Sequence, residues 1–599
     1  MKGMIHMKTS GTKNALWRRV LTLLTAALLL TGLLLTAGCS KEAQAETTAV
    51  TTVTYADGTV ISTGSSSVVN TDAFSDRDLA GSYDAGDAVS ITLNGTDAQV
   101  SGSGVTVSGS TVTITAAGTY VLRGSLDDGT VIVKAGKEDK VQLVLAGVSI
   151  HSETFAPIYV ASADKVFVTL EANTENSLSN GGSFTQIDDN NVDAVIFSKD
   201  DLTLNGSGSC TVTSPAGHGV VGKDDVVIAG GSWTLTAAKQ GVKAKDSLSV
   251  AAGEINVTAG KDGLHAENSD DAALGTVYIE GGSFTIVAAG DGISAAGSMR
   301  ISGGEFNVSN ASSAGDNDSQ KGIKAGGDLT ITGGTFRILT NDDALHADAC
   351  ISITEGSFTL SSGDDGIHAE QTLAISGGSI TVTRSYEGLE GLNILIAGGT
   401  IDVTASDDGI NAGGGNDQSG YGGRGGFEAD PNASLTISGG TIHVNARGDG
   451  LDSNGVLTLS GGTVYVSGPT DSGNGALDSG GGMTVTGGTL IAAGASGMAE
   501  NFGSASTQGA ILLNVGSQAA GSTITLTDEN GNVLLTWSPE KAYASVNLTC
   551  AGLVQGGTYT VTAGSFSQSL TLESLVYGQG SGMGGGMGGH GGGPGGRGR

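Results

Sequence analysis

Aromatic residues, proline and cysteine are all scarce in this chain of 599 residues. Aromatic residues make up 4% of it, and it contains 6 prolines and 4 cysteines. The first cysteine, Cys39, lies near the N-terminus, which leaves Cys210, Cys350 and Cys550 as an odd and widely spaced set. Such a set excludes a scaffold held together by disulfides. We therefore expect these three side chains to be buried as small apolar groups.

Positive charge is scarce as well. The chain has 28 Lys and Arg against 60 Asp and Glu, for a formal net charge of −32. Residues 1–38 contain five of the basic residues and no acidic one, so the chain without them carries −37 (−32 − 5). A surface this acidic repels nucleic acid and anionic lipid. We expect no nucleic-acid partner, whereas cations, neutral glycans and anionic glycans bridged by a cation are compatible with the charge.

The N-terminal segment, residues 1–38, predicts a lipoprotein signal peptide. Basic residues from Lys8 to Arg19 precede the apolar run "VLTLLTAALLLTGLLLTAG", which ends at Cys39. The word "LTAGC" resembles a bacterial lipobox, which implies lipidation at Cys39 after cleavage. This predicts a lipid anchor in the membrane and a location on the extracellular face of the cell membrane. Because the run is long enough to cross a bilayer, an uncleaved anchor is the alternative.

Glycine is abundant, at 102 residues, while apolar residues still reach 38%. This combination accompanies an internal repeat, in which "GIKAGGDLTITGGTFRIL" is followed by "ALHADACISITEGSFTL" and "GIHAEQTLAISGGSITV". The small residue that opens each unit recurs from Gly219 to Gly409 in steps of 22, 22, 29, 30, 22, 22, 22 and 21 residues. Each unit holds three short segments of alternating apolar and polar residues, and this alternation predicts half-buried strands.

Three strands and three turns in each repeat predict one coil of a right-handed, single-stranded parallel β-helix, an all-β fold. Glycine pairs mark the tight corners between strands. A β-sandwich would need longer strands and hairpin turns at regular places, and α/β folds would need helical periods, which the sequence does not show. A flexible tether is predicted over 39–80, followed by the β-helix over 81–505, whose first part, 81–135, is an N-terminal cap region. A C-terminal β-module is predicted over 506–575 and includes a hairpin at Asn530–Gly531. The last part, over 576–599, is predicted to be a disordered glycine-rich tail.

Several segments outside the repeat carry a family resemblance. They include "GSTVTITAAGTYVLRGSLDDGTVIV", "DKVQLVLAGVSI", "APIYVASADKVFVTL" and, near the end, "GGTYTVTAG". Over about residues 83–565 the chain resembles secreted bacterial carbohydrate-binding domain-containing proteins with a calcium-binding parallel β-helix, similar in fold to pectate lyases. The resemblance implies non-catalytic binding of plant cell-wall type polysaccharide, including acidic pectic chains, with bound calcium.

A column of polar residues emerges when the coils are aligned on their opening residue. The residue two positions later lies between two inward-pointing apolar residues, so we expect it to point outward. The column reads Lys243, His265, Ser294, Lys324, His346, His368, Glu390, Asn411 and Asp452. We call it the polar ladder. Zinc at its two adjacent histidines is disfavoured, because zinc needs three or four converging ligands.

Acidic residues gather in the turn before each of these strands. Equivalent turns of neighbouring coils lie about 5 Å apart, where unbridged carboxylates repel one another. Stacked carboxylate oxygens suit calcium, although Asp-Gly pairs are also ordinary turn residues whose charges are simply solvated. The sequence predicts calcium as the cofactor, with ligands among Asp342, Asp343, Asp364, Asp365, Glu387, Asp407 and Asp408.

Two regions offer candidate glycan contacts. One is the polar ladder with the residue two positions further along, and the other is an insertion over residues 413–434 that lengthens one step to 41 residues. An aromatic face suits a sugar ring and arginine suits a uronate carboxylate, although a long loop without any role is equally consistent. The candidates are Lys324, His346, His368, Glu370, Tyr421, Arg424 and Phe427.

Polysaccharide binding without catalysis, by a monomer at the cell surface, is the leading hypothesis. The first alternative is a calcium-dependent polysaccharide lyase, since β-elimination needs a cation on the uronate carboxylate and a base beside it. Lys324 is the basic residue next to the acidic coils, and His346 and His368 could replace it. The second alternative is a structural surface adhesin, which the low aromatic content favours over a cellulose-binding platform.

Overall fold

The structure is a computed structural model, and it describes residues 52–54, 60–62, 69, 71–311, 319–413 and 430–580. The signal segment with Cys39 and the three insertion residues Tyr421, Arg424 and Phe427 lie outside the described residues. Among the described residues, no helix is both long enough and apolar enough to cross a membrane.

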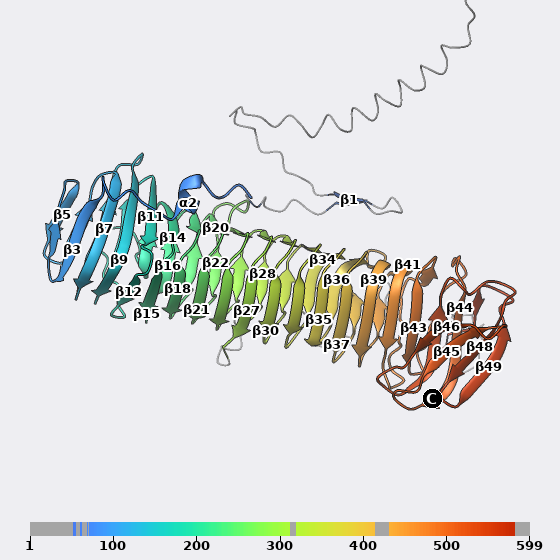
Figure 1. The fold of residues 1–599 in the computed structure, drawn as a ribbon. Coiled ribbons are helices and arrows are strands. Elements are labelled where there is room, and N and C mark those ends of the chain that lie inside the picture. The colour runs from blue at the N-terminus through green and yellow to red at the C-terminus, as the bar shows by residue number, and fades with distance from the viewer. Residues whose placement is uncertain are drawn as a thin grey trace, which may run out of the picture. The chain divides into compact units, whose positions relative to one another are not determined.

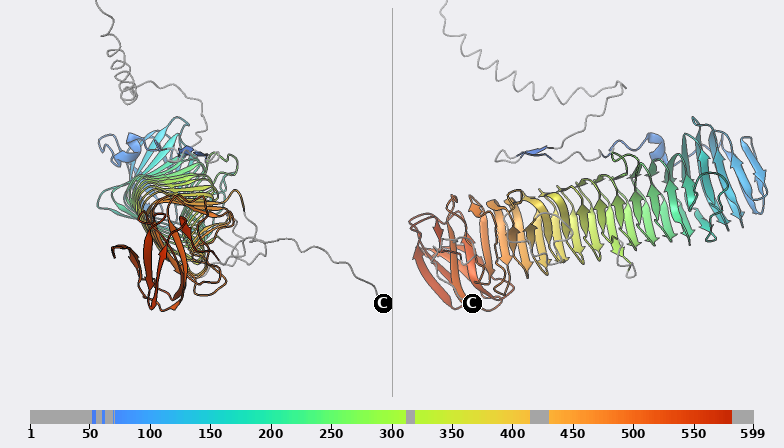
Figure 2. Two further views of the ribbon diagram at one scale, coloured as in Figure 1. Left: turned by 90° about the vertical axis from the view of Figure 1, so that its right-hand side faces the viewer. Right: turned by 180° about the vertical axis from the view of Figure 1, so that it is seen from behind.

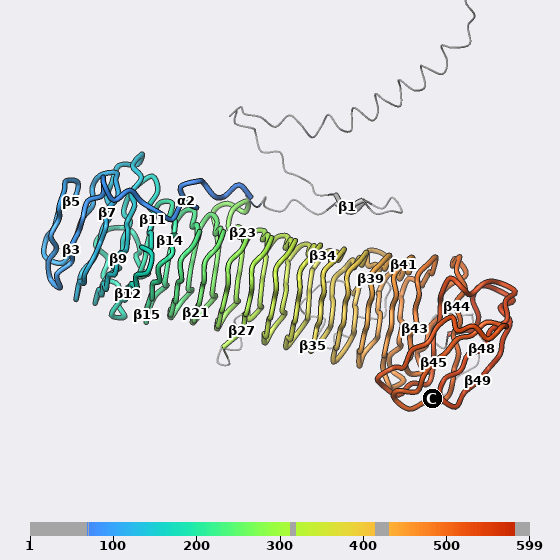
Figure 3. The backbone as a smooth tube through the Cα atoms, in the orientation of Figure 1, coloured from blue at the N-terminus to red at the C-terminus, as the bar shows by residue number. Residues whose placement is uncertain are grey.

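Most of the described chain forms a parallel β-helix, so the predicted fold class is confirmed (Figure 1). In the regular coils each strand pairs in parallel with the third strand along the chain. Three such pairs make one step from coil to coil: β16 (His218–Gly222) with β19 (Val242–Ala244), β17 (Val226–Ile228) with β20 (Ser247–Val250), and β18 (Ser232–Ala237) with β21 (Glu254–Ala259). Each turn of the backbone tube in Figure 3 is one coil, and the end-on view in Figure 2 shows successive coils lying over one another.

One of the three strand columns carries the polar ladder, and we call it the ladder sheet. Beyond β16 and β19 it consists of β22 (Leu264–Ala266), β25 (Ile293–Ala295), β28 (Ile323–Ala325), β31 (Leu345–Ala347), β34 (Ile367–Ile375), β36 (Leu389–Ile396), β38 (Ile410–Ala412) and β40 (Leu451–Ser453). Each of these strands pairs in parallel and in register with the next. Side chains at equivalent positions therefore stack along the β-helix.

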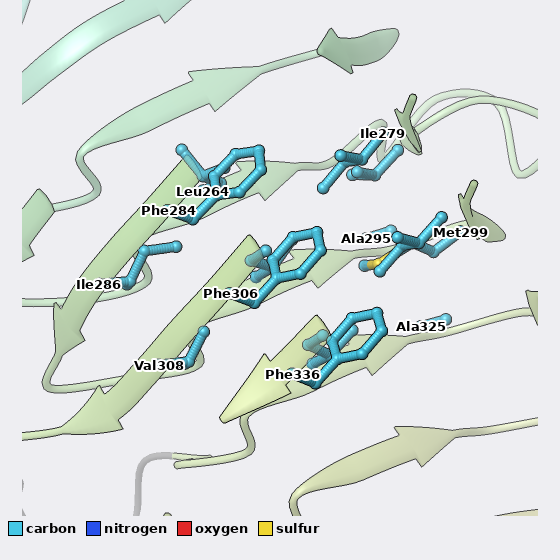
Figure 4. Packing of buried hydrophobic residues seen from close by; sticks show 14 of the residues in the cluster. Leu264, Ile279, Phe284, Ile286, Ala295, Met299, Phe306, Val308, Ala325 and Phe336 are labelled. Atoms are coloured by element: carbon cyan, nitrogen blue, oxygen red, sulfur yellow. The ribbon is translucent and has the colours of Figure 1, made fainter. Parts of the chain in front are cut away.

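The interior shows the same stacking. Four buried phenylalanines come from β24 (Ser283–Ala288), β27 (Glu305–Asn310), β30 (Thr335–Leu339) and β33 (Ser357–Ser361). Their rings lie parallel with centroids 4.6–4.7 Å apart, and Figure 4 shows three of them, Phe284, Phe306 and Phe336. Gly334 precedes β30 with φ +108°, and a Cβ there would lie 3.0 Å from the Phe336 ring, so the corner requires glycine.

The ends of the β-helix differ from its middle. At the N-terminal end, β3 (Val89–Gly95) pairs antiparallel with β4 (Ala98–Val100), and β5 (Val105–Ser108) pairs antiparallel with β6 (Thr111–Ile114). The last strand of one parallel column, β43 (Thr489–Gly494), is covered by antiparallel pairing with β47 (Tyr543–Thr549), which also pairs with β44 (Ala510–Gln518). Antiparallel pairing therefore covers the edge that a β-helix would otherwise leave open.

A four-stranded antiparallel sheet follows and shares a hydrophobic core with β43, β44 and β47. Its strands are β46 (Val533–Trp537), β45 (Ile524–Asp528), β48 (Thr558–Ala563) and β49 (Phe566–Thr571), in that order. The predicted hairpin at Asn530–Gly531 is confirmed, because β45 and β46 pair across it and Gly531 has φ +82°. The three remaining cysteines are free and buried as expected, and burial raises the pKa of the Cys210 thiol to about 12.

A short helix, α2 (Asp76–Ala80), docks against the early coils through one buried carboxylate. Asp78 Oδ1 lies 2.9 Å from Lys165 Nζ and accepts the Thr203 hydroxyl at 2.5 Å. Burial alone would raise the pKa of Asp78, but hydrogen bonds from Ser75, Thr203 and Lys165 outweigh it and hold the pKa below its usual value. The carboxylate therefore attaches this helix together with two other contacts: Asn205 donates to the Asp78 carbonyl at 2.9 Å, and Arg77 lies 4.4 Å over the Phe167 ring.

Asp78→Asn should undock α2 at neutral pH, because an amide cannot pair with Lys165. The wild-type attachment should also loosen in acid. Since the folded-state pKa is depressed, this contribution is complete above the unfolded value of about 3.9 and is lost as pH falls through the folded value. Hydrogen exchange of residues 71–88 should rise in the variant while the later coils stay protected, and equal protection in both proteins at pH 7 would contradict the assignment.

Candidate functional site

The polar ladder inferred from the repeat is a real column of the structure. The strand register joins each of its members to the next, from Lys243 in β19 to Asp452 in β40. The alignment of coils made on the sequence is therefore confirmed, including across the long insertion that separates Asn411 from Asp452.

The acidic turn residues bind neighbouring coils together. Asp343 Oδ1 accepts the backbone N–H of Asp365 at 3.0 Å, and Asp365 Oδ1 accepts that of Glu387 at 3.1 Å. Further along, Asp408 Oδ1 accepts the N–H of Asp449 at 2.6 Å. One oxygen of each of these three carboxylates thus links its turn to the turn of the next coil.

In the coil of Asp343 the second carboxylate oxygen is neutralised within the protein. Asp343 Oδ2 accepts Lys321 Nζ at 2.6 Å and His346 Nδ1 at 2.9 Å, and Lys321 also reaches Asp342 Oδ1 at 3.0 Å. Burial raises the pKa of Asp343, but His346, His368 and Lys321 outweigh it and hold the pKa well below its usual value. This is a closed network of ion pairs.

His346 is the cationic centre of that network. Burial lowers its pKa, yet the hydrogen bonds to Asp343 and to Asp348, the latter at 2.9 Å, raise it to about 9. A protonated imidazole donates from both nitrogens and has no lone pair left for a metal. Zinc ligation by this histidine is therefore disfavoured.

The expectation that His346 and His368 lie on an exposed face is wrong. Both residues are 1% exposed, and their rings pack edge to face with centroids 5.0 Å apart. The sequence pattern places them outside the strand, but the acidic turns and stacked neighbours bury them. Of the other glycan candidates, Lys324 is half-buried and Glu370 is exposed.

Beyond His368 the side chains of the polar ladder change from basic to acidic or amide. The position held by histidine in two successive coils is occupied by Glu390, then Asn411, then Asp452. His368 Nδ1 lies 3.5 Å from Glu390 Oε2 and 3.6 Å from Asp365 Oδ2. From this point carboxylates of the turns face carboxylates of the ladder.

The carboxylates of these later coils hold protons unusually tightly. Burial, followed by the charge of Asp407, raises the pKa of Asp408 to about 7. Burial, followed by the charge of Asp408, raises the pKa of Asp449 to about 8. Burial and the same carboxylates raise the pKa of Asp452 well above its usual value, as burial and Asp365 do for that of Glu387. The charged neighbours that shift these groups are mainly other carboxylates.

This donor set fits a hard cation. Oxygens of Asp365 and Glu390 lie with a His368 nitrogen within 4.8 Å of one another, and oxygens of Asp342, Asp343 and Asp364 form a similar group. Calcium takes six to eight oxygen ligands and would neutralise such a column. The second group, however, already pairs with Lys321. The later coils are therefore the better candidate for a cation.

The structure adds three residues to the predicted cation ligands: Glu390, Asp449 and Asp452. All three stand in columns of the coil alignment made on the sequence. The change from histidine at position 368 to glutamate at position 390 is the sequence signal that could have identified them. Their shared environment depends on burial between coils, which the repeat does not show.

Comparison with known proteins supports the family resemblance inferred from the sequence. Residues 108–366 match the family model described as carbohydrate-binding domain-containing protein. The resemblance to this family is confirmed. A carbohydrate-binding domain-containing protein of Acetivibrio thermocellus is 38% identical over 125 residues, which cover 20% of this chain and 44% of that relative. The match thus spans less than half the length of that relative.

A solved structure is also similar over part of the chain. It is described as a polysaccharide lyase-like protein from C. thermocellum, in a gadolinium derivative, and it is 28% identical. The match covers 48% of this chain and 96% of that structure, with a TM-score of 0.33. The stretch matched by the carbohydrate-binding family model ends at residue 366, before Glu387 and the later acidic coils.

Proposed function

We propose that this protein binds polysaccharide without catalysis and that its later coils hold calcium. The observation that carries the polysaccharide assignment is the match of residues 108–366 to the carbohydrate-binding family. The calcium assignment is supported by the carboxylate column from Asp365 to Asp452, whose members raise one another's pKa.

The residues proposed to hold calcium are Asp365, Glu387, Glu390, Asp407, Asp408, Asp449 and Asp452. Asp342, Asp343 and Asp364 remain neighbours of the site, but Lys321 and His346 already occupy Asp343 Oδ2. A bound calcium ion would neutralise these carboxylates and could coordinate an oxygen of an acidic sugar. The proposed polysaccharide is of plant cell-wall type, including acidic pectic chains.

The absence of catalysis is supported by the state of the nearby basic groups. A lyase needs a basic side chain that can take a proton beside the bound uronate. Lys321 is 5% exposed and is held between Asp342 and Asp343, and His346 is protonated by its two carboxylate partners. Neither group can act as the base in this arrangement, which leaves Lys324 and His368 as the candidate bases of the lyase alternative. Lyase activity is therefore an outcome of the test below rather than the proposal.

We further propose that the protein is a monomer attached by a lipid at Cys39 to the extracellular face of the cell membrane. The lipobox-like word "LTAGC" supports this attachment. Intact mass measurement of the membrane-extracted protein should show diacylglycerol on Cys39, and Cys39→Ala should release the protein from the membrane fraction. A wild-type protein that retains residues 1–38 would contradict lipidation.

The purified full chain in mild detergent should bind immobilised polygalacturonate more tightly with calcium than with a chelator. The same samples should show no absorbance from an unsaturated sugar product, because binding is proposed without elimination. A neutral galactan serves as the matched polysaccharide. Formation of product would identify a lyase instead, and failure to bind either polymer would favour a structural adhesin.

A further inference from the structure

A cavity of about 410 Å³ opens beside the early strands of the ladder sheet, well before the acidic coils. Four lysines line it: Lys223, Lys239, Lys243 and Lys261. They come from the strands and turns of three successive coils around β16, β19 and β22. We call this cavity the basic pocket.

The basic pocket has a charge opposite to that of the whole chain. Four lysines and the two carboxylates that line it, Asp193 and Glu267, leave a net charge of +2 (4 − 2), with His218 neutral. The chain as a whole carries −32. A concentration of lysines at one hollow of so acidic a protein favours an anionic ligand there.

Part of the positive charge is already used within the protein. Asp193 Oδ2 accepts Lys239 Nζ at 2.6 Å and lies 3.3 Å from His218 Nε2. Glu267 Oε2 accepts Lys243 Nζ at 3.0 Å. Within the described part of the chain, Lys223 Nζ and Lys261 Nζ form no ion pair with a carboxylate, and Lys223 lies 5.6 Å over the Phe197 ring. These two ammonium groups are available to a ligand.

His218 provides a further polar group at the pocket. Its side chain is 8% exposed, and its Nδ1 has no hydrogen-bond partner among the described residues. Burial and the nearby lysines lower the pKa of His218 against the opposing effect of Asp193. The pKa of Lys223 is lowered by burial and by Lys243, Lys245 and Lys239. The cations of the pocket thus repel one another in the absence of a bound anion.

The lysines are arranged along the axis of the β-helix. Val242 in β19 is in register with Leu264 in β22. Lys239 and Lys261 precede these two residues by three positions each, so they occupy equivalent positions of adjacent coils. Equivalent positions of adjacent coils lie about 4.8 Å apart. Lys223 follows β16 and Lys261 precedes β22 two coils further on, so the two unpaired ammonium groups are spread along the β-helix. This spread suits a linear chain that carries a charge on successive units better than it suits one small anion.

We propose that the basic pocket binds the carboxylates of two neighbouring uronate residues of an acidic polysaccharide, without calcium. This inference rests on the proposed function and specifies the substrate class. Lys223 and Lys261 donate to the carboxylates, while Lys239 and Lys243 stay paired with Asp193 and Glu267. Acidic polysaccharide would then meet the protein in two ways, directly at the basic pocket and through calcium at the later coils.

The test is calorimetric titration of the full chain, in mild detergent with chelator present, using trigalacturonate as the probe. Wild-type protein should bind, and Lys223→Gln with Lys261→Gln should weaken binding at least about tenfold through loss of two charge-assisted hydrogen bonds. The matched control is Lys134→Gln with Lys140→Gln, which removes two exposed lysines elsewhere and should leave the affinity unchanged. Raising the salt concentration should weaken wild-type binding and have less effect on the pocket variant.

Three results would overturn the inference. These are equal binding of trigalacturonate by the pocket variant and the wild type, equal binding of neutral galactotriose, and displacement of the sugar by inorganic sulfate at the same concentration. The polygalacturonate assay with calcium separates this inference from the proposed function. If the wild type binds the polymer with calcium but does not bind trigalacturonate in chelator, only the basic pocket assignment fails.

Discussion

Calcium added to the metal-free protein should raise its Tm by several degrees, and Asp408→Asn combined with Asp449→Asn should abolish that rise. The reason is that these carboxylates sit among other carboxylates in coils that hold them close together, so a bound cation relieves repulsion present only in the folded state. A ligand at 100 times its Kd stabilises the native state by about 2.7 kcal/mol. Differential scanning calorimetry with calcium or with chelator measures the effect.

The same double variant gives a second readout. In chelator it should melt at a higher temperature than the wild type, because the asparagines keep the acceptor that binds Asp449 N–H and Gly475 N–H but lose the charge. Asp224→Asn combined with Asp225→Asn is the matched control, since these residues belong to another acidic group of the β-helix. A Tm indifferent to calcium and chelator, together with a native mass that lacks calcium, would contradict the proposed cation site.

Lys321→Met should lower the free energy of unfolding by about 3–5 kcal/mol, the usual cost of removing one partner from a buried ion pair. The methionine would leave Asp343 buried with one fewer cation and would release Asp342. Urea denaturation followed by circular dichroism measures the change. Lys324→Met is the control, because Lys324 belongs to the same ladder sheet but is only half-buried, and we expect it to cost less than about 1 kcal/mol.

A second substitution shows whether the charge is responsible. Lys321→Met combined with Asp343→Asn also removes the carboxylate that lost its partner, and it should recover much of the lost stability because His346 keeps its pairing with Asp348. If Lys321→Met alone costs as little as Lys324→Met, the network around Asp343 does not stabilise the coils as the distances indicate.

The two ends of the ladder sheet have opposite chemistry on one repeated scaffold. At the early coils lysines surround a hollow, and at the later coils carboxylates face one another. Distant coils of a β-helix can vary independently, since every coil contacts only its neighbours. The sequence changes from Lys243 to Asp452 therefore change the ligand chemistry along the sheet while the register stays constant.

The coil, its three strands and the columns of side chains could all be predicted from the amino-acid sequence. Alternation and a constant step are local signals, and in-register parallel pairing turns them directly into stacked positions, as the ladder from Lys243 to Asp452 and the stacked phenylalanines show. Even the turn at Asn530–Gly531 follows from local residue preference.

The tertiary structure alone decided which of those positions are buried and which charges are compensated. The sequence pattern predicts that His346 and His368 point outward, yet neighbouring coils bury them. Lys321 neutralises Asp343 from one coil earlier, whereas Asp408 and Asp449 lie among other carboxylates that raise their pKa values. The basic pocket likewise joins Asp193, Lys223 and Lys261 from separate coils. Electrostatic balance depends on distances between side chains of neighbouring coils and on exclusion of water. The repeat period of the sequence contains no information about either of these.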